Sequence, residues 1–311
     1  MGKLVTKSFL QIKYIKLHFT IKMSDDAVLP VQKASALRGG MGEMLLRVNC
    51  VGNRDCENCE YEPECIVRRI MYSKMRIQPE FMSSGDSVGY VIDCENYQEK
   101  FDAGDLLEFD VVLFGRMIVY FGQIVQAFQM LGFWGLGKDH ARFQIQGITN
   151  SKRERILTGN DIIMSNVKPV SLADYVSYRK KQDITGGKVV FHTPLAIKKS
   201  GVFLKEFNIE AILKAAERRI YQLNCYEGIN ADRPNMEEHI PTAQYLSDRT
   251  VSVRRFSNRS EQKIRLDGIC GEIEISDLDE TGYEILLAGE ITHIGKNTSF
   301  GFGRLSFIEM G

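Results

Sequence analysis

Two short glycine-rich turns occupy matching places in the two halves of this 311-residue chain, and they constrain its fold more than any other feature. Gly135-Leu-Gly137-Lys138 and Gly301-Phe-Gly303-Arg304 each follow a stretch with helical apolar spacing and precede a short strand-like stretch. Glycine permits the positive φ angles and the close backbone approach that such turns need. Because the surroundings of the two turns match, we predict that the second half repeats the first. A chance recurrence among 27 glycines is the alternative.

The other stretches follow the same order in both halves. Apolar residues three and four positions apart predict helices, and alternating apolar residues predict strands. In the first half, strands are predicted at 12–23, 88–94, 106–114 and 142–148, and helices at 34–48 and 118–131. In the second half, strands are predicted at 188–197, 250–256, 263–275 and 304–308, and helices at 209–224 and 283–292. The order βαββαβ therefore occurs twice.

This duplicated order predicts an α+β protein with two tandem ferredoxin-like (RRM-like) domains, each carrying its helices on one face of an antiparallel sheet. We place the first domain at residues 1–150 and the second at residues 188–311. The polar and charged residues 151–187 are predicted to be a linker region. The length of the chain also favours two domains.

Composition restricts the possible partners. The chain is 44% hydrophobic and 26% charged with a formal net charge of zero, so a surface for nucleic acid must be a local basic cluster. Lys13 and Lys16 interrupt the N-terminal apolar stretch, which argues against a signal peptide. Residues 117–137 are apolar enough to suggest a membrane span, but glutamines recur along one side, so we predict a half-buried helix. We expect a cytoplasmic protein without a membrane partner.

Four of the seven cysteines lie close together in an insert of the first half. Cys50, Cys56, Cys59 and Cys65 form the pattern C-x5-C-x2-C-x5-C. Four thiolates at such spacing can surround Zn²⁺ tetrahedrally, and the same four can hold an iron–sulfur cluster. We predict a structural zinc site, because four cysteine ligands leave no position open for a reacting water. The alternatives are an iron–sulfur cluster and an insert without metal.

Several segments carry a resemblance to a known superfamily. They are Ser35-Ala-Leu-Arg-Gly-Gly, Leu113-Phe-Gly with the helix and glycine turn after it, Phe191-His-Thr-Pro-Leu, and the C-terminal loop with its lead-in Gly289-Glu-Ile-Thr-His-Ile-Gly-Lys. Through these segments the chain resembles the RAMP proteins of CRISPR systems, and among them the endoribonucleases that cleave repeat RNA to process precursor CRISPR RNA. The resemblance covers nearly the whole chain outside the linker region, and the C-terminal loop is its most specific part.

The resemblance implies tandem ferredoxin-like domains and CRISPR repeat RNA as the substrate. It also implies cleavage that needs no metal or other cofactor and leaves a 2′,3′-cyclic phosphate and a 5′-hydroxyl. Subunits of a CRISPR effector complex are possible partners, and either a monomer or a homodimer fits the duplicated chain. One feature departs from the family pattern: a histidine often placed on the first helix is missing from residues 34–48. A RAMP subunit that holds guide RNA without cutting it is therefore the alternative.

Cleavage of RNA by its own 2′-hydroxyl needs a base for that proton, an acid for the 5′-oxygen, and cations near the charged intermediate. Histidine suits the first two roles because its unperturbed pKa is near neutrality. We predict His293 and His192 as catalytic residues, with Lys296 offsetting the transition-state charge. The alternatives are that His293 caps the C-terminus of a helix and that His192 is a half-buried strand residue.

The densest basic run with an aromatic residue inside it is Arg254-Arg255-Phe-Ser-Asn-Arg259. Strand alternation would place Arg255, Ser257 and Arg259 on one side, where they could grip an RNA backbone. A charged hairpin in solvent is the alternative. Outside this run, the predicted RNA-binding residues lie in the two glycine turns: Gly295, Asn297, Thr298, Ser299, Gly301, Gly303, Arg304 and Lys138.

Overall fold

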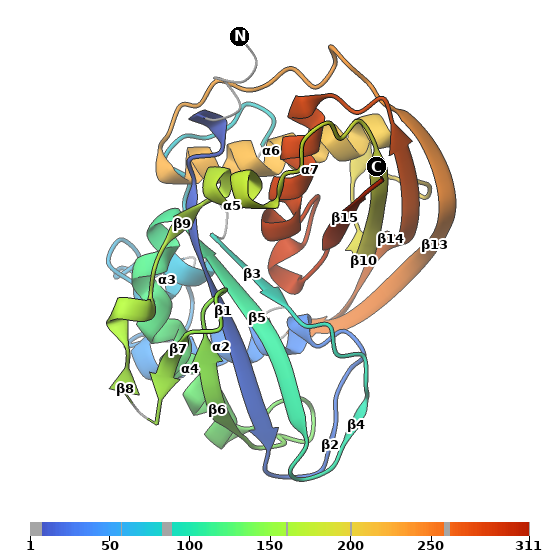
Figure 1. The fold of residues 1–311 in the computed structure, drawn as a ribbon. Helices are drawn as coiled ribbons and strands as arrows, with labels where there is room; N and C mark the ends of the chain where they lie inside the picture. The colour runs from blue at the N-terminus through green and yellow to red at the C-terminus, as the bar shows by residue number, and fades with distance from the viewer. Residues whose placement is uncertain are drawn as a thin grey trace. The chain divides into compact units, whose positions relative to one another are not determined.

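The computed structural model describes residues 8–56, 58–82, 89–159, 161–199, 201–257 and 262–310, with only the backbone at 254–257 and 262–263 (Figure 1). The chain forms two compact units. The first unit is Tyr14–Pro169, and the second unit combines Met1–Lys13 with Val170–Gly311. This division differs from the predicted boundaries at 1–150, 151–187 and 188–311.

An antiparallel sheet with the strand order β3-β5-β1-β6-β7-β8 forms the base of the first unit. Its central strand β1 pairs with β5 on one side and with β6 on the other. Leu17, Phe19 and Ile21 of β1 are buried while the residues between them are partly exposed, as alternation in a strand requires. The strands are β1 (Lys13–Met23), β3 (Tyr90–Asp93), β5 (Leu106–Phe114), β6 (Phe143–Thr149), β7 (Arg155–Thr158) and β8 (Asp161–Ile162), with a separate ladder of β2 (Ala27–Val28) and β4 (Lys100–Phe101).

The helices of the first unit are α2 (Ala34–Asn49), α3 (Ile66–Met71) and α4 (Phe121–Trp134), which follows the 3-10 helix η1 (Gly115–Tyr120). Phe128 of α4 packs against Phe19 and Phe109 of the sheet, with ring centroids 5.1 and 5.0 Å away. In the described part of the chain, the helical stretch Gly115–Trp134 is the one that is long and apolar enough to cross a membrane. The aromatic and aliphatic side chains that it buries in the core account for this apolar character.

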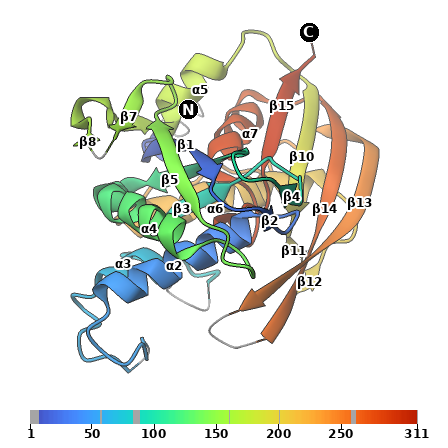
Figure 2. The ribbon, with the colours of Figure 1, turned by 90° about the horizontal axis from the view of Figure 1, so that it is seen from below.

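A second antiparallel sheet, with the order β13-β14-β10-β15, forms the base of the second unit. Helices α6 and α7 cover one face of it (Figures 1 and 2). The strands are β10 (Gly187–Leu195), β13 (Thr242–Ser257), β14 (Gln262–Ser276) and β15 (Leu305–Glu309). The helices are α5 (Leu172–Arg179), α6 (Ile209–Glu227) and α7 (Glu280–Thr292), and the minor elements are β9 (Val170–Ser171), β11 (Lys198–Lys199), β12 (Val202–Phe203) and the 3-10 helix η3 (Thr298–Phe300).

Side-chain caps define the ends of the helices in the second unit. Asn208 accepts a hydrogen bond from the backbone N–H of Ala211 at the start of α6, and Asp279 accepts one from Gly282 at the start of α7. Gly228 ends α6 in the left-handed conformation with φ 82°. Each cap satisfies backbone groups that a helix end otherwise leaves without a partner.

The predicted α+β class is confirmed, and the four strands of each βαββαβ repeat lie in the order second, third, first, fourth. Two of the predicted boundaries need correction. β13 begins at Thr242 rather than at residue 250, because its first part is mostly exposed and polar and therefore shows no apolar alternation. The region predicted as a linker forms β7, β8 and α5, and the 3-10 helix η2 (Met164–Asn166) lies between them.

The N-terminal segment belongs to the second unit rather than to the first predicted domain. Phe9 and Leu10 are buried. The side chain of Asn224 on α6 donates to the carbonyl of Phe9 at 2.9 Å, and the N–H of Ala173 on α5 donates to Leu10 at 2.8 Å. Hydrogen bonds over such a long sequence separation leave no local signal, so sequence periodicity does not detect them.

Candidate active site

The loop between α7 and β15 depends on residues in the left-handed backbone region. Gly295, Asn297, Gly301 and Gly303 have φ values of 85°, 64°, 80° and 71°. A Cβ at Gly303 would lie 1.8 Å from the carbonyl oxygen of Ile294, so no larger residue fits there without moving the backbone. The glycines therefore fix a tight loop, as the sequence pattern predicts.

Hydrogen bonds attach this loop to the C-terminal end of β10. The Thr193 hydroxyl donates to the carbonyl of Gly301 at 2.6 Å and accepts from the N–H of Arg304 at 2.9 Å. The N–H of Gly303 donates to Pro194 at 3.0 Å, and the N–H of Lys296 donates to Ala196 at 2.8 Å. One segment of the sheet thus determines the position of the whole loop.

These bonds change the expected role of the loop residues in RNA binding. The N–H groups of Gly301 and Gly303 donate to protein carbonyls, so they do not point toward a phosphate. Thr298 and Ser299 are buried, whereas Lys296 is exposed and Arg304 is partly exposed. Among the predicted loop contacts, the two charged side chains are therefore the ones best placed to meet RNA.

His293 occupies the C-terminal cap of α7 and is 3% exposed. Its φ is 56°, and its Nδ1 lies 3.1 Å from the carbonyl oxygen of Phe302, to which it can donate a hydrogen bond. The ring thus links the end of the helix to the glycine-rich loop. This geometry favours the capping alternative, because a histidine enclosed in this way does not reach a bound substrate.

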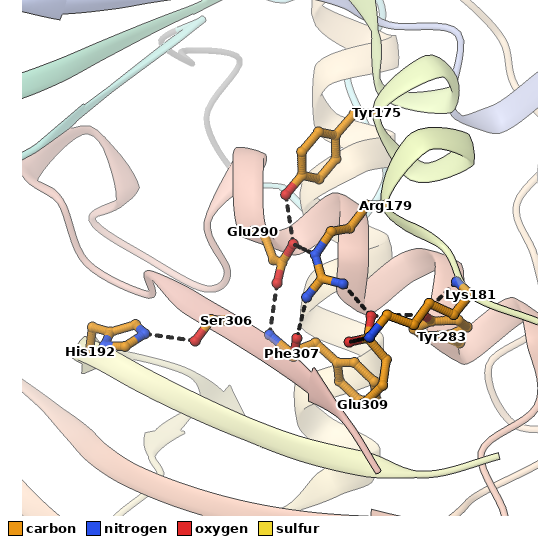
Figure 3. Close-up of polar contacts among 9 residues, drawn as sticks. All are labelled: Tyr175, Arg179, Lys181, His192, Tyr283, Glu290, Ser306, Phe307 and Glu309. Atoms are coloured by element: carbon orange, nitrogen blue, oxygen red, sulfur yellow. Dashed lines mark hydrogen bonds and ion pairs between the residues drawn. The ribbon is translucent and has the colours of Figure 1, made fainter. Parts of the chain in front are cut away.

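His192 lies on β10 and is exposed. Its Nε2 lies 2.8 Å from the Oγ of Ser306 on the neighbouring strand β15 (Figure 3). The alternation along β10 buries Val189 and Phe191 on the helical side and turns His192 to the other face of the sheet. Of the predicted catalytic histidines, His192 is the one that solvent and substrate can reach.

A network of charged and aromatic residues between α5, α7 and β15 was not predicted from the sequence. Glu290 of α7 accepts from the Tyr175 hydroxyl at 2.7 Å and from the N–H of Phe307 at 2.8 Å (Figure 3). Arg179 lies 3.5 Å from Glu290 and also pairs with Glu309. The network joins α5, α7 and β15, so it holds the strand that carries Ser306.

The charges of this network influence each other. Burial of Glu309 opposes its ionisation, but hydrogen bonds from the backbone and from Tyr283 and the charge of Arg179 outweigh burial and lower its pKa. Burial likewise lowers the pKa of Arg179, but Glu290 and Glu309 outweigh that effect and raise it. Both groups are therefore ionised at neutral pH, and the network is a set of charge-assisted hydrogen bonds.

The remaining predicted RNA contacts are less well defined. Arg255 and Ser257 lie in β13, where their backbones pair with Ile264 and Gln262 of β14. Arg259 lies outside the described residues. Lys138 is exposed in the glycine turn of the first unit, where Leu136 and Ala141 form a β-bridge. The assignment of these residues to RNA binding stays a prediction.

The four cysteines of the insert are half-buried and form no disulfide. Cys50 is the C-terminal cap of α2, and Cys65 is the N-terminal cap of α3. Burial raises the pKa of the Cys56 thiol, and the thiols of Cys65, Cys50 and Cys59 raise it further. Within the described ranges, no three His, Cys, Asp or Glu side chains are arranged to hold a metal ion.

Comparisons with solved structures identify a shared fold. A Cas6 in a product complex aligns with a TM-score of 0.55 and 11% identity over 95% of this chain and 99% of that chain. Thermus thermophilus Cas6 aligns with a TM-score of 0.51 and 9% identity over 96% and 99%. A partial Cas6-RT-Cas1–Cas2 complex aligns with a TM-score of 0.56 and 10% identity over 96% of this chain, which spans 46% of the matched chain. No curated protein matches the chain.

Two family models match consecutive parts of the chain. Residues 10–171 match the model AF_1859_N, which is described as an N-terminal domain. Residues 189–305 match the model of the CRISPR-associated endoribonuclease Cas6, and this range contains β10, α6, the β13–β14 hairpin, α7 and the glycine-rich loop. The predicted resemblance to the endoribonucleases that process CRISPR RNA is therefore confirmed, and residues 189–305 form a Cas6 domain.

Proposed function

We propose that this protein is an endoribonuclease that cleaves CRISPR repeat RNA to release guide RNAs, by a reaction that needs no metal. The match of residues 189–305 to the Cas6 endoribonuclease model carries the proposal. The fold shared with a Cas6 in a product complex supports it. Two tandem ferredoxin-like domains, related by duplication, are part of this proposal, because both sheets have the same strand order.

His192 is the histidine that we assign to the reaction. In the proposed step, the 2′-oxygen loses its proton and bonds to the adjacent phosphorus while the bond from phosphorus to the 5′-oxygen breaks. The 5′-oxygen gains a proton, and the products carry a 2′,3′-cyclic phosphate and a 5′-hydroxyl. An imidazole can take the first proton or supply the second.

Ser306 suits the role of orienting this imidazole. A hydroxyl can donate to an unprotonated ring nitrogen and accept from a protonated one. The contact of 2.8 Å between Ser306 and Nε2 can therefore persist in both protonation states of His192. The network between α5, α7 and β15 holds the strand of Ser306 through Glu290 and the N–H of Phe307.

Lys296 and Arg304 are proposed to offset the charge that develops on the phosphate. Lys296 is exposed on the glycine-rich loop, and the bond from its N–H to Ala196 fixes the backbone that carries it. Within the described residues the Lys296 ammonium makes no ion pair, so pairing with RNA would not break one. Preorganised cations of this kind stabilise a charged transition state.

An RNA-holding subunit that does not cut is the second candidate function. Two observations favour it: α2 contains no histidine, and His293 is buried in a structural role. Proteins of a CRISPR complex are proposed as partners under either function, because a structural neighbour is a Cas6-RT-Cas1–Cas2 complex.

Cleavage of a labelled repeat RNA in EDTA tests the proposal. The comparison substrate carries a 2′-deoxy group at the cut site. We expect one cut that persists in EDTA and is blocked by the deoxy group. Tight binding of the repeat without a cut would instead support the RNA-holding function.

The His192→Ala variant then tests the assigned residue. We expect the cleavage rate to fall by about 10²- to 10⁴-fold, the usual contribution of a general acid or base. His239→Ala is the matched control, because His239 is also an exposed histidine of the second unit. Equal rates for the two variants would reject His192 as the catalytic residue.

A further inference from the structure

The four-cysteine insert sits at the tip of a helical hairpin. A Cβ at Gly42, in the middle of α2, would lie 2.6 Å from the Cε of Met71, the last residue of α3. Helix α3 therefore runs back along α2 (Figure 2), and the helix ends that carry Cys50 and Cys65 lie at the same end of the hairpin. The chain between them contains the other two cysteines.

Ion pairs attach this tip to both helices. Arg54 lies 3.1 Å from Glu43 of α2. Glu62 lies 3.4 Å from Arg68 of α3 and 2.9 Å from Lys74 beyond it. These pairs are at least partly exposed, and solvent screens such pairs, so they contribute little to the stability of the tip.

The tip has no hydrophobic core of its own. None of its described residues from 51 to 65 is buried, and its apolar side chains Val51 and Tyr61 are 82% and 52% exposed. The cysteines are among its few half-buried residues. A segment that cannot bury apolar surface needs a cross-link or a metal to take one conformation.

We propose that Cys50, Cys56, Cys59 and Cys65 bind one Zn²⁺ ion through four thiolates, and that this metal holds the tip of the α2–α3 hairpin. The hairpin places the first and last ligands at the same end, and Cys56 and Cys59 have the C-x2-C spacing of a zinc-binding pair. Glu62 and Cys65 donate backbone N–H groups to Cys59 and Glu62, which turns the chain back toward α3.

Cys50 and Cys65 stand at the adjoining ends of α2 and α3, and Cys56 and Cys59 lie in the short chain between them. Among the described residues the four side chains do not form a ready ligand set, so binding requires the tip to rearrange around the ion. The tip can do so at low cost, because it has no packed core to disturb. Four thiolates fill a tetrahedral site and leave no position for a water, so the ion would be structural and would not enter RNA cleavage.

Metal analysis of the full-length protein, purified without oxygen and dialysed against Zn²⁺, tests this assignment. We expect about one zinc per chain and no iron or sulfide. The double variant Cys56→Ser/Cys59→Ser should lose the zinc, whereas Glu60→Gln, an exposed residue of the same tip, should retain it. A protein without zinc, or one that carries iron and sulfide, would overturn the proposal.

A second test uses Co²⁺ in the unaltered protein, so its result does not depend on whether the cysteine variants fold. In the unaltered protein, Co²⁺ bound by four thiolates should give strong thiolate-to-metal charge-transfer absorption and the visible bands of a tetrahedral site. Addition of Zn²⁺ should remove both signals. Weak absorption typical of octahedral Co²⁺ would show that the thiols do not form the site.

Discussion

The two glycine turns share a sequence pattern and a place in the fold, yet the steric constraint on the second glycine differs between them. In the first unit, a Cβ at Gly135 would lie 2.0 Å from the carbonyl oxygen of His140, whereas one at Gly137 would first meet a flexible leucine side chain at 3.1 Å. In the second unit, a Cβ at the second glycine, Gly303, would lie 1.8 Å from the carbonyl oxygen of Ile294.

The difference follows from the hydrogen bonds that each turn makes within the protein. The first turn closes on itself through hydrogen bonds of 2.8 and 3.1 Å between Leu136 and Ala141. The second turn is bonded to β10 through Thr193 and Pro194, next to the proposed catalytic His192. The same pattern therefore provides a simple reversal in one unit and, in the other, a loop bonded to the strand that carries the proposed catalytic residue.

The largest expected effect is that of Gly303→Ala. The substitution forces a side chain into a left-handed backbone position and against Ile294, so we expect a loss of about 3 kcal/mol or more in unfolding free energy. RNA cleavage should be lost with it. Denaturant unfolding followed by circular dichroism measures the change. An unchanged midpoint would show that the loop adjusts and that the steric comparison is wrong.

Gly135→Ala and Gly137→Ala test the order of constraint within the first turn. Gly135→Ala should cost about 3 kcal/mol, while Gly137→Ala should cost about 1 kcal/mol because only backbone strain remains after Leu29 moves. Trp134, the single tryptophan, lies beside this turn, so its fluorescence follows the unfolding of the first unit. Equal losses for the two variants would remove the distinction between the turns.

Thr193→Val tests the attachment of the second turn to β10. The substitution keeps the shape but removes the hydroxyl that bonds to Gly301 and Arg304, so we expect a loss of about 2 kcal/mol. Thr193→Ser keeps the hydroxyl, so this variant should retain most of the stability that Thr193→Val loses. Cleavage should fall in the valine variant more than in the serine variant, because the loop that carries Lys296 loosens. Equal stability of both variants would contradict the assigned bonds.

The sequence was sufficient for elements with a strong apolar pattern. The strand predicted at 106–114 coincides with β5, because buried residues alternate along its first half and its last four residues are all buried. The first part of β13 was missed since its polar residues carry no such pattern. Residues 151–187 were predicted as a linker because polar composition does not distinguish a linker from short strands and a small exposed helix.

The position of the glycine-rich loop was predictable, but the contacts of its residues were not. The glycines marked the loop, yet only the structure shows that their N–H groups donate to the protein and that His293 is enclosed. Arg179 and Glu309 lie far apart in the sequence, and nothing in the pattern selects that pair among 80 charged residues. The partner of a side chain depends on tertiary packing, which local patterns do not contain.

The smallest expected effect is the pH dependence of the stability contributed by charged contacts next to the strand after each turn. Before β6, Arg142 makes two bonds of 2.9 Å to Asp25, and these hydrogen bonds lower the pKa of Asp25 to about 2. Because the folded pKa lies below the unfolded value of 3.8, this pair stabilises the fold fully above pH 3.8, and the contribution disappears as the pH falls through about 2. The lowered pKa of Glu309 at β15 has the same sign, with the loss below pH 4.5.

Asp25→Asn and Glu309→Gln separate these two contributions. An asparagine side chain has no charge to lose on acidification, so the first variant should flatten the acid-induced fall in stability that Trp134 fluorescence reports between about pH 4 and 2. The effect should be small, because Arg142 is exposed and salt screens such pairs. Glu309→Gln should flatten the fall that circular dichroism reports below pH 4.5, and by more, because Glu309 is nearly enclosed and bonded to Arg179 and Tyr283. If Asp25→Asn had the greater effect, the exposed pair rather than the enclosed network would be the stronger anchor of its strand.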